Sequence, residues 1–482
     1  MLRAVKQAVG TTMTRQAMRF CERDPITNIP KLARLIERGT DLPNIQRFCR
    51  QAKALMADER NPYRSLILRI FNEIAPQVRR KFVSNFVINS GIVGAEQAMR
   101  NGRNLGVNIP WAILLDPTSA CNLRCKGCWA GEYGKRDNLS FDEMDRIIGE
   151  GKELGIFFYL FSGGEPLVRK DDLIRLADTH SECAFLAFTN GTLVDPPLAR
   201  ELVRVGNFAL AFSIEGRDEA TDYRRGEGVY EAVLASMDIM HEAGAPFGFS
   251  TCYHARNVDA IADESYLDSL IQRGCMFGWF FTYIPCGKEA LPELITPPEK
   301  RAFMFERVRD WRKRKPIFLI DFWNDGAYTN GCIAGGKAYF HINAAGDVEP
   351  CAFIHYSDRN IRTSSLVDAL RSPLFKAYQS AQPFNENHLR PCPLLDNPQA
   401  LLGMVLKTEA HSTQPLDEED VRELTAKCES AAEGWAPTAD TLWHDMASDY
   451  ENRERVRRAE RAFMEERGKK NAVGHHTRNR SL

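Results

Sequence analysis

The chain has 482 residues, enough for about three domains and a large apolar core. Hydrophobic residues make up 44% and charged residues 26%, the usual mix of a globular protein. The 63 basic and 64 acidic residues give a net charge of −1, which argues against a nucleic acid as the main partner. The sequence shows no signal-peptide pattern and no apolar stretch of roughly 20 residues, so we expect a cytoplasmic protein.

Residues 1–110 are predicted to be mainly helical, because apolar residues recur there at helical spacing. We interpret this region as a helical layer packed on the next domain, and Cys21 and Cys49 as buried thiols. The alternative is a helix that faces a lipid or a membrane surface, with peripheral membrane contact. The predicted helices cover residues 29–39, 45–55, 64–74 and 81–92.

From residue 111 to about 320, apolar runs alternate with helical patterns. Such alternation implies parallel βα units, arranged as a partial barrel or as an open doubly wound sheet. The first helical pattern begins with a capping box from Ser140 to Glu143. The predicted strands are Ala112–Asp116, Ile156–Ser162, Ala184–Thr189, Phe208–Ser213, Pro246–Cys252 and Phe277–Tyr283, with Ile317–Asp321 as a late addition.

Three cysteines, Cys121, Cys125 and Cys128, follow the first predicted strand within one short loop. Thiolates at this spacing can hold one metal centre, and a [4Fe–4S] cube with three protein ligands keeps one iron open. In α/β barrels the loops at the carboxyl ends of the strands carry the chemistry. A zinc knuckle and a set of core cysteines remain as alternatives at this point.

Polar turns follow the next three strands. Gly163 and Gly164 allow close approach of a ligand, and the neighbouring Glu165 can receive an ammonium group. Asn190 ends the third strand, and Ser213 ends the fourth. Each turn alone would fit a solvated loop, but several at one edge of a sheet indicate a ligand site.

A second set of cysteines, Cys332, Cys351, Cys392 and Cys428, lies around and beyond a predicted hairpin whose turn contains Gly346. Four thiolates complete an iron–sulfur cube, and a structural zinc site is the alternative. Cys428 stands alone on a predicted helix, which makes Cys286 a rival as fourth ligand. The chain is expected to end in a charged helix from Asp440 and a disordered tail over 468–482.

The cysteine loop and the Gly163–Pro166 turn together resemble the radical S-adenosylmethionine (radical SAM) superfamily. The resemblance implies a partial (β/α)6 barrel in which the open iron holds the amino and carboxylate groups of S-adenosylmethionine. An electron from the cluster then breaks the sulfonium bond, and the resulting 5′-deoxyadenosyl radical takes hydrogen from an unactivated C–H bond. The electron would come from an external donor such as flavodoxin or ferredoxin.

The resemblance also implies roles for individual residues. Many members of the superfamily carry a bulky residue where this chain has Gly127, so Trp129 would supply the packing against the cluster or the adenine. The expected cofactor contacts are Gly163, Gly164, Glu165 and Pro166 for the amino group, Ser213 and Glu215 for the ribose or the methionine end, Arg225 for a carboxylate, and Asn190.

The C-terminal cysteines resemble the SPASM or Twitch extensions of radical SAM enzymes, with one auxiliary [4Fe–4S] cluster in a small α+β unit. The expected domains are 1–110, 111–320, 321–435 and 436–482. Such extensions often accompany peptide or protein modification, which makes a peptide or protein the first candidate substrate. The second is C–C bond formation or functionalisation on a lipid or isoprenoid. A different class would be a non-catalytic iron–sulfur electron carrier or a zinc-stabilised adaptor.

Overall fold

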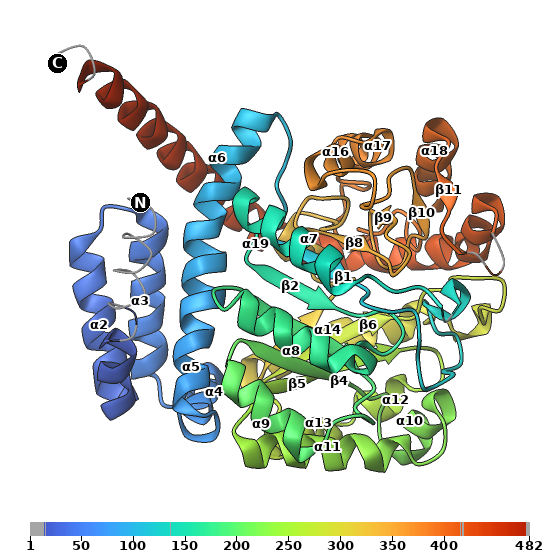
Figure 1. Ribbon diagram of the computed structural model, residues 1–482, viewed down its shortest axis with the longest axis horizontal. Helices are drawn as coiled ribbons and strands as arrows, with labels where there is room; N and C mark the ends of the chain where they lie inside the picture. The colour runs from blue at the N-terminus through green and yellow to red at the C-terminus, as the bar shows by residue number, and fades with distance from the viewer. Residues whose placement is uncertain (1–13, 15, 135, 415, 417–418, 479–482) are drawn as a thin grey trace.

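The computed structural model describes residues 14–478, apart from residues 15, 135, 415, 417 and 418. Its centre is a mixed α/β body built on one large, mostly parallel sheet (Figure 1). The strand order in this sheet is β7-β6-β5-β4-β3-β2-β1-β8-β9. The strands are β1 Ala112–Leu115, β2 Phe158–Phe161, β3 Ala184–Thr189, β4 Phe208–Ser213, β5 Phe247–Tyr253, β6 Phe277–Thr282, β7 Phe318–Asp321, β8 Tyr339–Ile342 and β9 Val348–Glu349.

The six strands predicted between residues 112 and 283 are present, and each pairs in parallel with its neighbour. Strand β7 lies in the predicted late apolar segment and extends the sheet beyond β6. At the other side β8 pairs in parallel with β1, so the sheet continues past the predicted six strands in both directions. Strand β9 returns antiparallel to β8, as the predicted hairpin requires, but it ends at Glu349.

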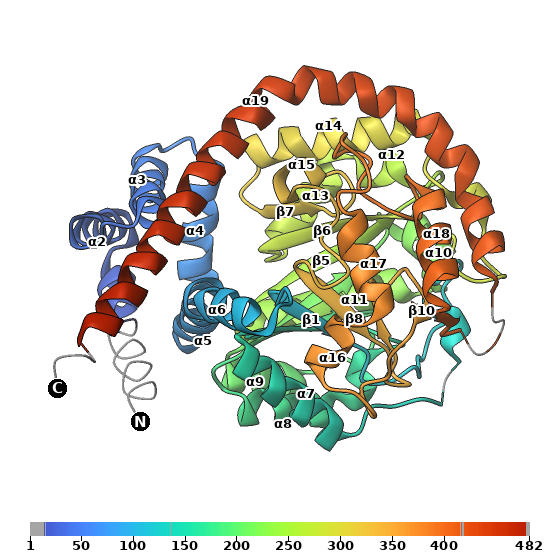
Figure 2. The ribbon, with the colours of Figure 1, turned by 90° about the horizontal axis from the view of Figure 1, so that it is seen from above.

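Helices connect the successive parallel strands and cover one face of the sheet (Figures 1 and 2). The predicted capping box is present, because Ser140 Oγ accepts from Glu143 N while the Glu143 carboxylate accepts from Ser140 N. The connecting helices are α7 Phe141–Leu154, α8 Lys170–Thr179, α9 Pro196–Val205, α10 Asp218–Arg225, α11 Val229–Ala243, α12 Val258–Ile261, α13 Glu264–Gln272 and α14 Pro298–Arg314.

The central strands β1 and β2 are buried on both faces, as expected for a parallel sheet. Successive side chains point to opposite faces, so Ile113 and Tyr159 pack under the helices. Leu114 and Leu160 belong to a second apolar cluster on the other face. That second face surrounds the cavities described below.

The N-terminal region is helical over the described residues, as predicted, and Cys21 and Cys49 are buried. The segment predicted as a separate helix over 81–92 is part of one continuous helix from Pro76 to Leu105, whose middle is a π-helix. The helices are α2 Pro25–Gly39, α3 Pro43–Ala57, α4 Pro62–Glu73, α5 Pro76–Phe82, the π-helix η1 Val83–Gly94 and α6 Ala95–Leu105.

The C-terminal part ends in one long helix, α19 Val421–Arg478, that arcs around the body (Figure 2). It continues from Gly468 to Arg478 through the segment predicted to be disordered, so that part of the prediction is wrong; this stretch contains no proline that would end the helix. Residues 479–482 of that prediction lie outside the described part. The remaining elements are α15 Gly326–Thr329, β10 Tyr356–Ser357, α16 Leu366–Leu370, α17 Pro373–Ala381, α18 Pro398–Thr408 and β11 His411–Ser412. No helix among the described residues is both long and apolar enough to cross a membrane.

Candidate active site

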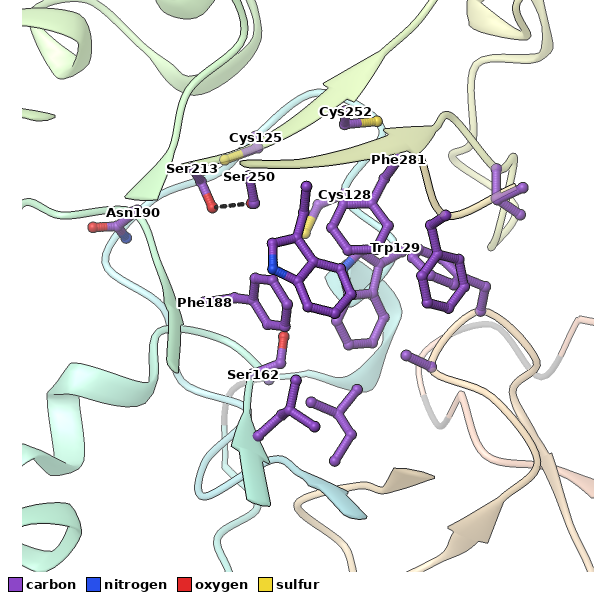
Figure 3. Close-up of a pocket in the computed structure, with 18 of the residues that line it drawn as sticks. Cys125, Cys128, Trp129, Ser162, Phe188, Asn190, Ser213, Ser250, Cys252 and Phe281 are labelled. Atoms are coloured by element: carbon purple, nitrogen blue, oxygen red, sulfur yellow. Dashed lines mark hydrogen bonds between the residues drawn. The ribbon is translucent and has the colours of Figure 1, made fainter. Parts of the chain in front are cut away.

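A cavity of about 220 Å³ lies on the face of the sheet opposite the connecting helices, and all three thiols of the cysteine loop line it. Figure 3 shows two of them, Cys125 and Cys128. Cys121, Cys125 and Cys128 therefore face one space, although they come from a loop without regular structure. A backbone bond from Lys126 N to Arg224 O, 2.8 Å long, ties the middle of the loop to the end of α10. The loop is thus positioned by a segment about a hundred residues away.

The Gly163-Gly164 turn after β2 packs directly on the start of the cysteine loop. Gly164 N donates to Thr118 O at 2.9 Å, and Glu165 N donates to Ala120 O at 2.8 Å. A Cβ atom on Gly163, which has a φ of +103°, would lie 2.5 Å from Thr118 O, and one on Gly164 would lie 2.2 Å from Ala120 O. Only glycine permits this approach, so the two turns form one unit.

The carboxylate of Glu165 organises the next turn. It is 1% exposed and accepts from Thr189 Oγ1 and Asn190 N, both at 2.7 Å, and from Leu167 N at 2.9 Å. Burial raises the pKa of Glu165 although these donors oppose the shift. Glu165 also lines the cavity, whereas Pro166, which begins a short 3₁₀ turn, does not.

Polar side chains from β3, β4 and β5 border the cavity. Asn190 Nδ2 donates to Asn122 Oδ1 at 2.9 Å and lies 4.0 Å from Cys121 Sγ. The hydroxyl oxygens of Ser213 and Ser250 lie 3.4 Å apart on neighbouring strands (Figure 3). These groups place hydrogen-bonding atoms beside the thiols in an otherwise apolar space.

Two arginines bring positive charge to the cysteine loop. Arg225 donates to Glu215 Oε1 from Nε at 3.0 Å and from Nη2 at 2.5 Å, and its Nη1 lies 3.9 Å from Cys125 Sγ. Arg224 Nη1 donates to the same oxygen at 2.7 Å. Burial alone would raise the pKa of Glu215, but the two guanidinium charges outweigh it and lower that pKa. Glu215 lies behind the arginines and does not line the cavity.

Aromatic side chains form the rest of the cavity wall. Phe188, Trp279 and Phe281 line it together with Trp129. Trp129 also contacts His341, with ring centroids 5.8 Å apart. Three further aromatic residues near the strand ends, Phe161, Phe212 and Phe249, point to the opposite face and belong to the core under the helices.

Three cysteines of the second set, Cys332, Cys351 and Cys392, line a neighbouring cavity of about 620 Å³. Tyr339 Oη lies 2.8 Å from Cys351 Sγ, and Tyr378 Oη lies 3.3 Å from Cys332 Sγ. The two cavities share a wall, so the two cysteine sets are separated mainly by apolar side chains. The shared residues are Trp111, Trp279, Phe322, Ile333 and Phe353.

Cys286 and Cys428, the rival fourth ligands, lie in the same apolar cluster as Cys351 but do not line the second cavity. Burial raises the pKa of Cys286, and the charges of Glu419, Cys428 and Cys351 raise it further. Burial also raises the pKa of Cys428, and the charge of Cys392 raises that pKa further. Both thiols are therefore near the second set.

All thirteen cysteines are free thiols. Within the described ranges, no three or more His, Cys, Asp or Glu side chains form a group that could hold a single metal ion. The candidate metal donors at both sites are cysteine sulfurs. At the first site the guanidinium of Arg225 lies next to Cys125 Sγ. Thiolate donors of this kind fit an iron–sulfur cluster.

Comparison with known proteins identifies the domain. Residues 115–263 match the family model described as "Radical SAM superfamily". The chain contains a radical SAM domain and is an S-adenosylmethionine-dependent iron–sulfur enzyme. The matched residues include the first cysteine loop and end before the second cysteine set.

Curated relatives and a solved structure agree with this domain. An AdoMet-dependent heme synthase of Methanosarcina barkeri is 27% identical over 53% of this chain and 80% of its own length. A PqqA peptide cyclase of Streptomyces rochei is 26% identical over 58% of this chain and 78% of its own. The fold is similar to that of Streptococcus suis SuiB bound to S-adenosylmethionine, with a TM-score of 0.52 and 14% identity over 70% of this chain and 81% of that one.

Most of the predicted contacts lie around one cavity of the radical SAM domain. The predicted residues that line it are Cys121, Cys125, Cys128, Trp129, Gly163, Gly164, Glu165, Asn190, Ser213 and Arg225. Sequence reasoning missed Arg224, Ser250, Cys252 and Thr282, which also line it. Side chains two residues apart on a strand point to the same face, so Ser250 and Cys252 of β5 point to one face together. This alternation could have indicated from the sequence that the two residues share the cavity.

Proposed function

We propose that Cys121, Cys125 and Cys128 hold a [4Fe–4S] cluster that supplies the electron for reductive cleavage of S-adenosylmethionine, followed by hydrogen abstraction from an unactivated C–H bond. The observation that carries this proposal is the convergence of the three thiols on a single cavity beside the Gly163-Gly164 turn. A cube held by three thiolates keeps one iron free for a further ligand.

The protein's own residues bind and orient in this proposal. Arg225 supplies a guanidinium for a carboxylate, and Asn190, Ser213 and Glu165 supply hydrogen-bonding groups for the polar parts of S-adenosylmethionine. Pro166 and Glu215 would act from behind the cavity, by shaping the turn and by holding Arg225. The aromatic wall excludes water from the reacting centre.

We further propose one auxiliary [4Fe–4S] cluster at Cys332, Cys351 and Cys392, with Cys428 or Cys286 as the fourth ligand, as in SPASM or Twitch extensions. The shared apolar wall between the two cavities supports it, since a substrate bound there would contact both sites. The auxiliary cluster would accept an electron from the substrate or anchor it. A zinc site with four cysteines is the competing assignment.

The first candidate substrate is a peptide or protein. The support is the PqqA peptide cyclase among the relatives, which names a peptide as its substrate. The second candidate, a lipid or isoprenoid, is favoured by the apolar lining of both cavities and by apolar side chains exposed on the N-terminal helices. In either case an external donor such as flavodoxin or ferredoxin supplies the electron.

Anaerobic reconstitution followed by metal and product analysis tests the proposal. Two cubes predict about eight irons per chain, and dithionite with S-adenosylmethionine should yield 5′-deoxyadenosine. Cys125→Ala should lose about four irons and all 5′-deoxyadenosine. Cys183→Ala, at a buried thiol under the helices, is the matched control and should keep both. Zinc in place of iron after oxygen-free purification would favour the adaptor, and iron without 5′-deoxyadenosine would favour an electron carrier.

A further inference from the structure

The continuous helix from Pro76 to Leu105 has an unusual distribution of polar and apolar side chains. Between Lys81 and Glu96 it carries no charged residue. Its exposed side chains there include Phe82 at 41% and Ile92 at 47% exposure, with Val87 and Val93 also exposed. A helix on the surface of a globular protein normally turns its polar face to water, so this exposed face is suited to an apolar environment.

The polar side chains of the same segment are buried. Asn85 Nδ2 donates to Ser181 O at 2.9 Å and to Cys183 O at 2.8 Å, and Asn89 Nδ2 donates to Glu182 O at 2.9 Å. These bonds cap the turn before β3 and fix the rotation of the helix. The apolar residues are therefore held outward by specific contacts on the opposite side.

A row of aromatic rings leads from this exposed face to the candidate active site. Phe82 stacks on Phe86 at 5.1 Å between centroids, and Phe86 contacts Trp111 at 5.5 Å and Phe158 at 5.1 Å. Trp111 is 40% exposed and lines both cavities, and Phe158 lines the one that contains the three thiols. The apolar surface is thus continuous with the interior of the enzyme.

The N-terminal helical region that contains this helix has an excess of positive charge. Residues 1–110 carry 19 Lys and Arg against 8 Asp and Glu, whereas residues 111–482 carry 44 against 56. On α2, Lys31, Arg34 and Arg38 surround the exposed Leu35 at helical spacing. Figures 1 and 2 both place α2 and α3 at the outside of the molecule, with α4–α6 between them and the sheet.

We propose that the N-terminal helical region docks on a membrane surface that contains anionic lipid, with Phe82, Ile92 and Val93 in the apolar boundary. Basic charge next to exposed apolar side chains is the combination that binds helices to anionic bilayers. For the lipid substrate, and in that respect resting on the proposed function, the apolar surface along Phe82, Phe86 and Trp111 is the route from the bilayer towards the thiols.

Vesicle flotation of the full chain tests the docking. The protein should float with vesicles of phosphatidylcholine and phosphatidylglycerol, bind weakly to phosphatidylcholine alone, and lose binding at high salt. Ile92→Gln with Val93→Gln should weaken binding by about tenfold or more, since two exposed apolar side chains are removed from the boundary. Lys31→Glu with Arg34→Glu should weaken binding only to the anionic vesicles.

The matched control is Leu406→Gln on α18, which replaces an equally exposed apolar residue away from the region and should leave flotation unchanged. Circular dichroism confirms that each variant is folded. Absence of flotation with anionic vesicles, or equal loss in the control, would overturn the docking. A dimer that the Ile92→Gln and Val93→Gln changes dissociate would assign the face to a second copy instead. Formation of 5′-deoxyadenosine is measured separately, so failure of the docking leaves the proposed chemistry intact.

Discussion

His341 Nε2 lies 2.8 Å from Asp116 Oδ2, across the pairing of β8 with β1. The other ring nitrogen, Nδ1, lies 2.6 Å from Glu349 Oε2. One fully buried imidazole therefore joins the radical SAM domain to the strand that leads to Cys351. Burial alone would lower the pKa of His341, but the two carboxylates raise it to about 10.

This ion pair predicts a specific dependence of stability on pH. The unfolded histidine loses its proton near pH 6.5, whereas the folded one keeps it to about pH 10. The stabilisation is thus complete below pH 6.5 and is lost as the pH rises towards 10. His341→Gln should cost about 3 kcal/mol at pH 7, and the difference from the unaltered chain should shrink as the pH rises. Urea unfolding at several pH values measures it, with the exposed His411→Gln as control; a constant difference would contradict the assignment.

The buried carboxylate of Glu215 should be a second point of stability. It pairs with Arg224 and Arg225, and none of the three side chains is more than 11% exposed. Glu215→Gln would leave two guanidinium groups without a counter-charge, and we expect a loss of about 3 kcal/mol in the free energy of unfolding. Glu201→Gln removes one of the two exposed carboxylate partners of Arg204 and should cost less than about 1 kcal/mol. Equal losses in urea unfolding would show that burial of the Glu215 pair contributes nothing.

Local sequence patterns predicted most of the fold. Apolar runs and helical periods located the six strands and the N-terminal helices, because these signals depend on neighbours in the chain. The pairing of β8 with β1, the contact of His341 with Asp116 and the rotation of the Pro76–Leu105 helix depend on residues that are far apart in sequence. The spacing of apolar residues within one segment carries no information about such long-range contacts.

The candidate site was predictable to a similar extent. Glycines and cysteines mark its turns in the sequence, since few other residues fit a close backbone approach or a thiolate donor. The sequence does not separate the aromatic residues near the strand ends by role: Phe161, Phe212 and Phe249 belong to the core, whereas Phe188 lines the cavity. Neighbouring residues on a strand point to opposite faces, so an error of one residue in the predicted strand moves an aromatic side chain from the core to the cavity, or the reverse.

Gly164→Ala should disrupt assembly of the proposed iron site at the cysteine loop without unfolding the protein. The added methyl group would lie 2.2 Å from Ala120 O, which is backbone and cannot move without displacing the cysteine loop. We expect the variant to lose about four irons per chain and most 5′-deoxyadenosine formation. Gly403→Ala, in helix α18 with open space around it, should keep both and gain about 0.5–1 kcal/mol. Full iron content in Gly164→Ala would show that the two turns can separate without loss.

The fourth ligand of the proposed auxiliary cluster can be assigned by comparing Cys286 with Cys428. Cys286 Sγ donates a hydrogen bond to Phe353 O at 3.4 Å, which favours the protonated thiol over a metal-bound thiolate. We therefore expect Cys428→Ala to lose about four of eight irons and Cys286→Ala to keep all of them. Cys275→Ala, at a buried thiol in the core under the helices, controls for loss of packing. Iron analysis and electron paramagnetic resonance measure the outcome. The reverse pattern would assign Cys286, since neither change touches the cluster proposed at Cys121, Cys125 and Cys128.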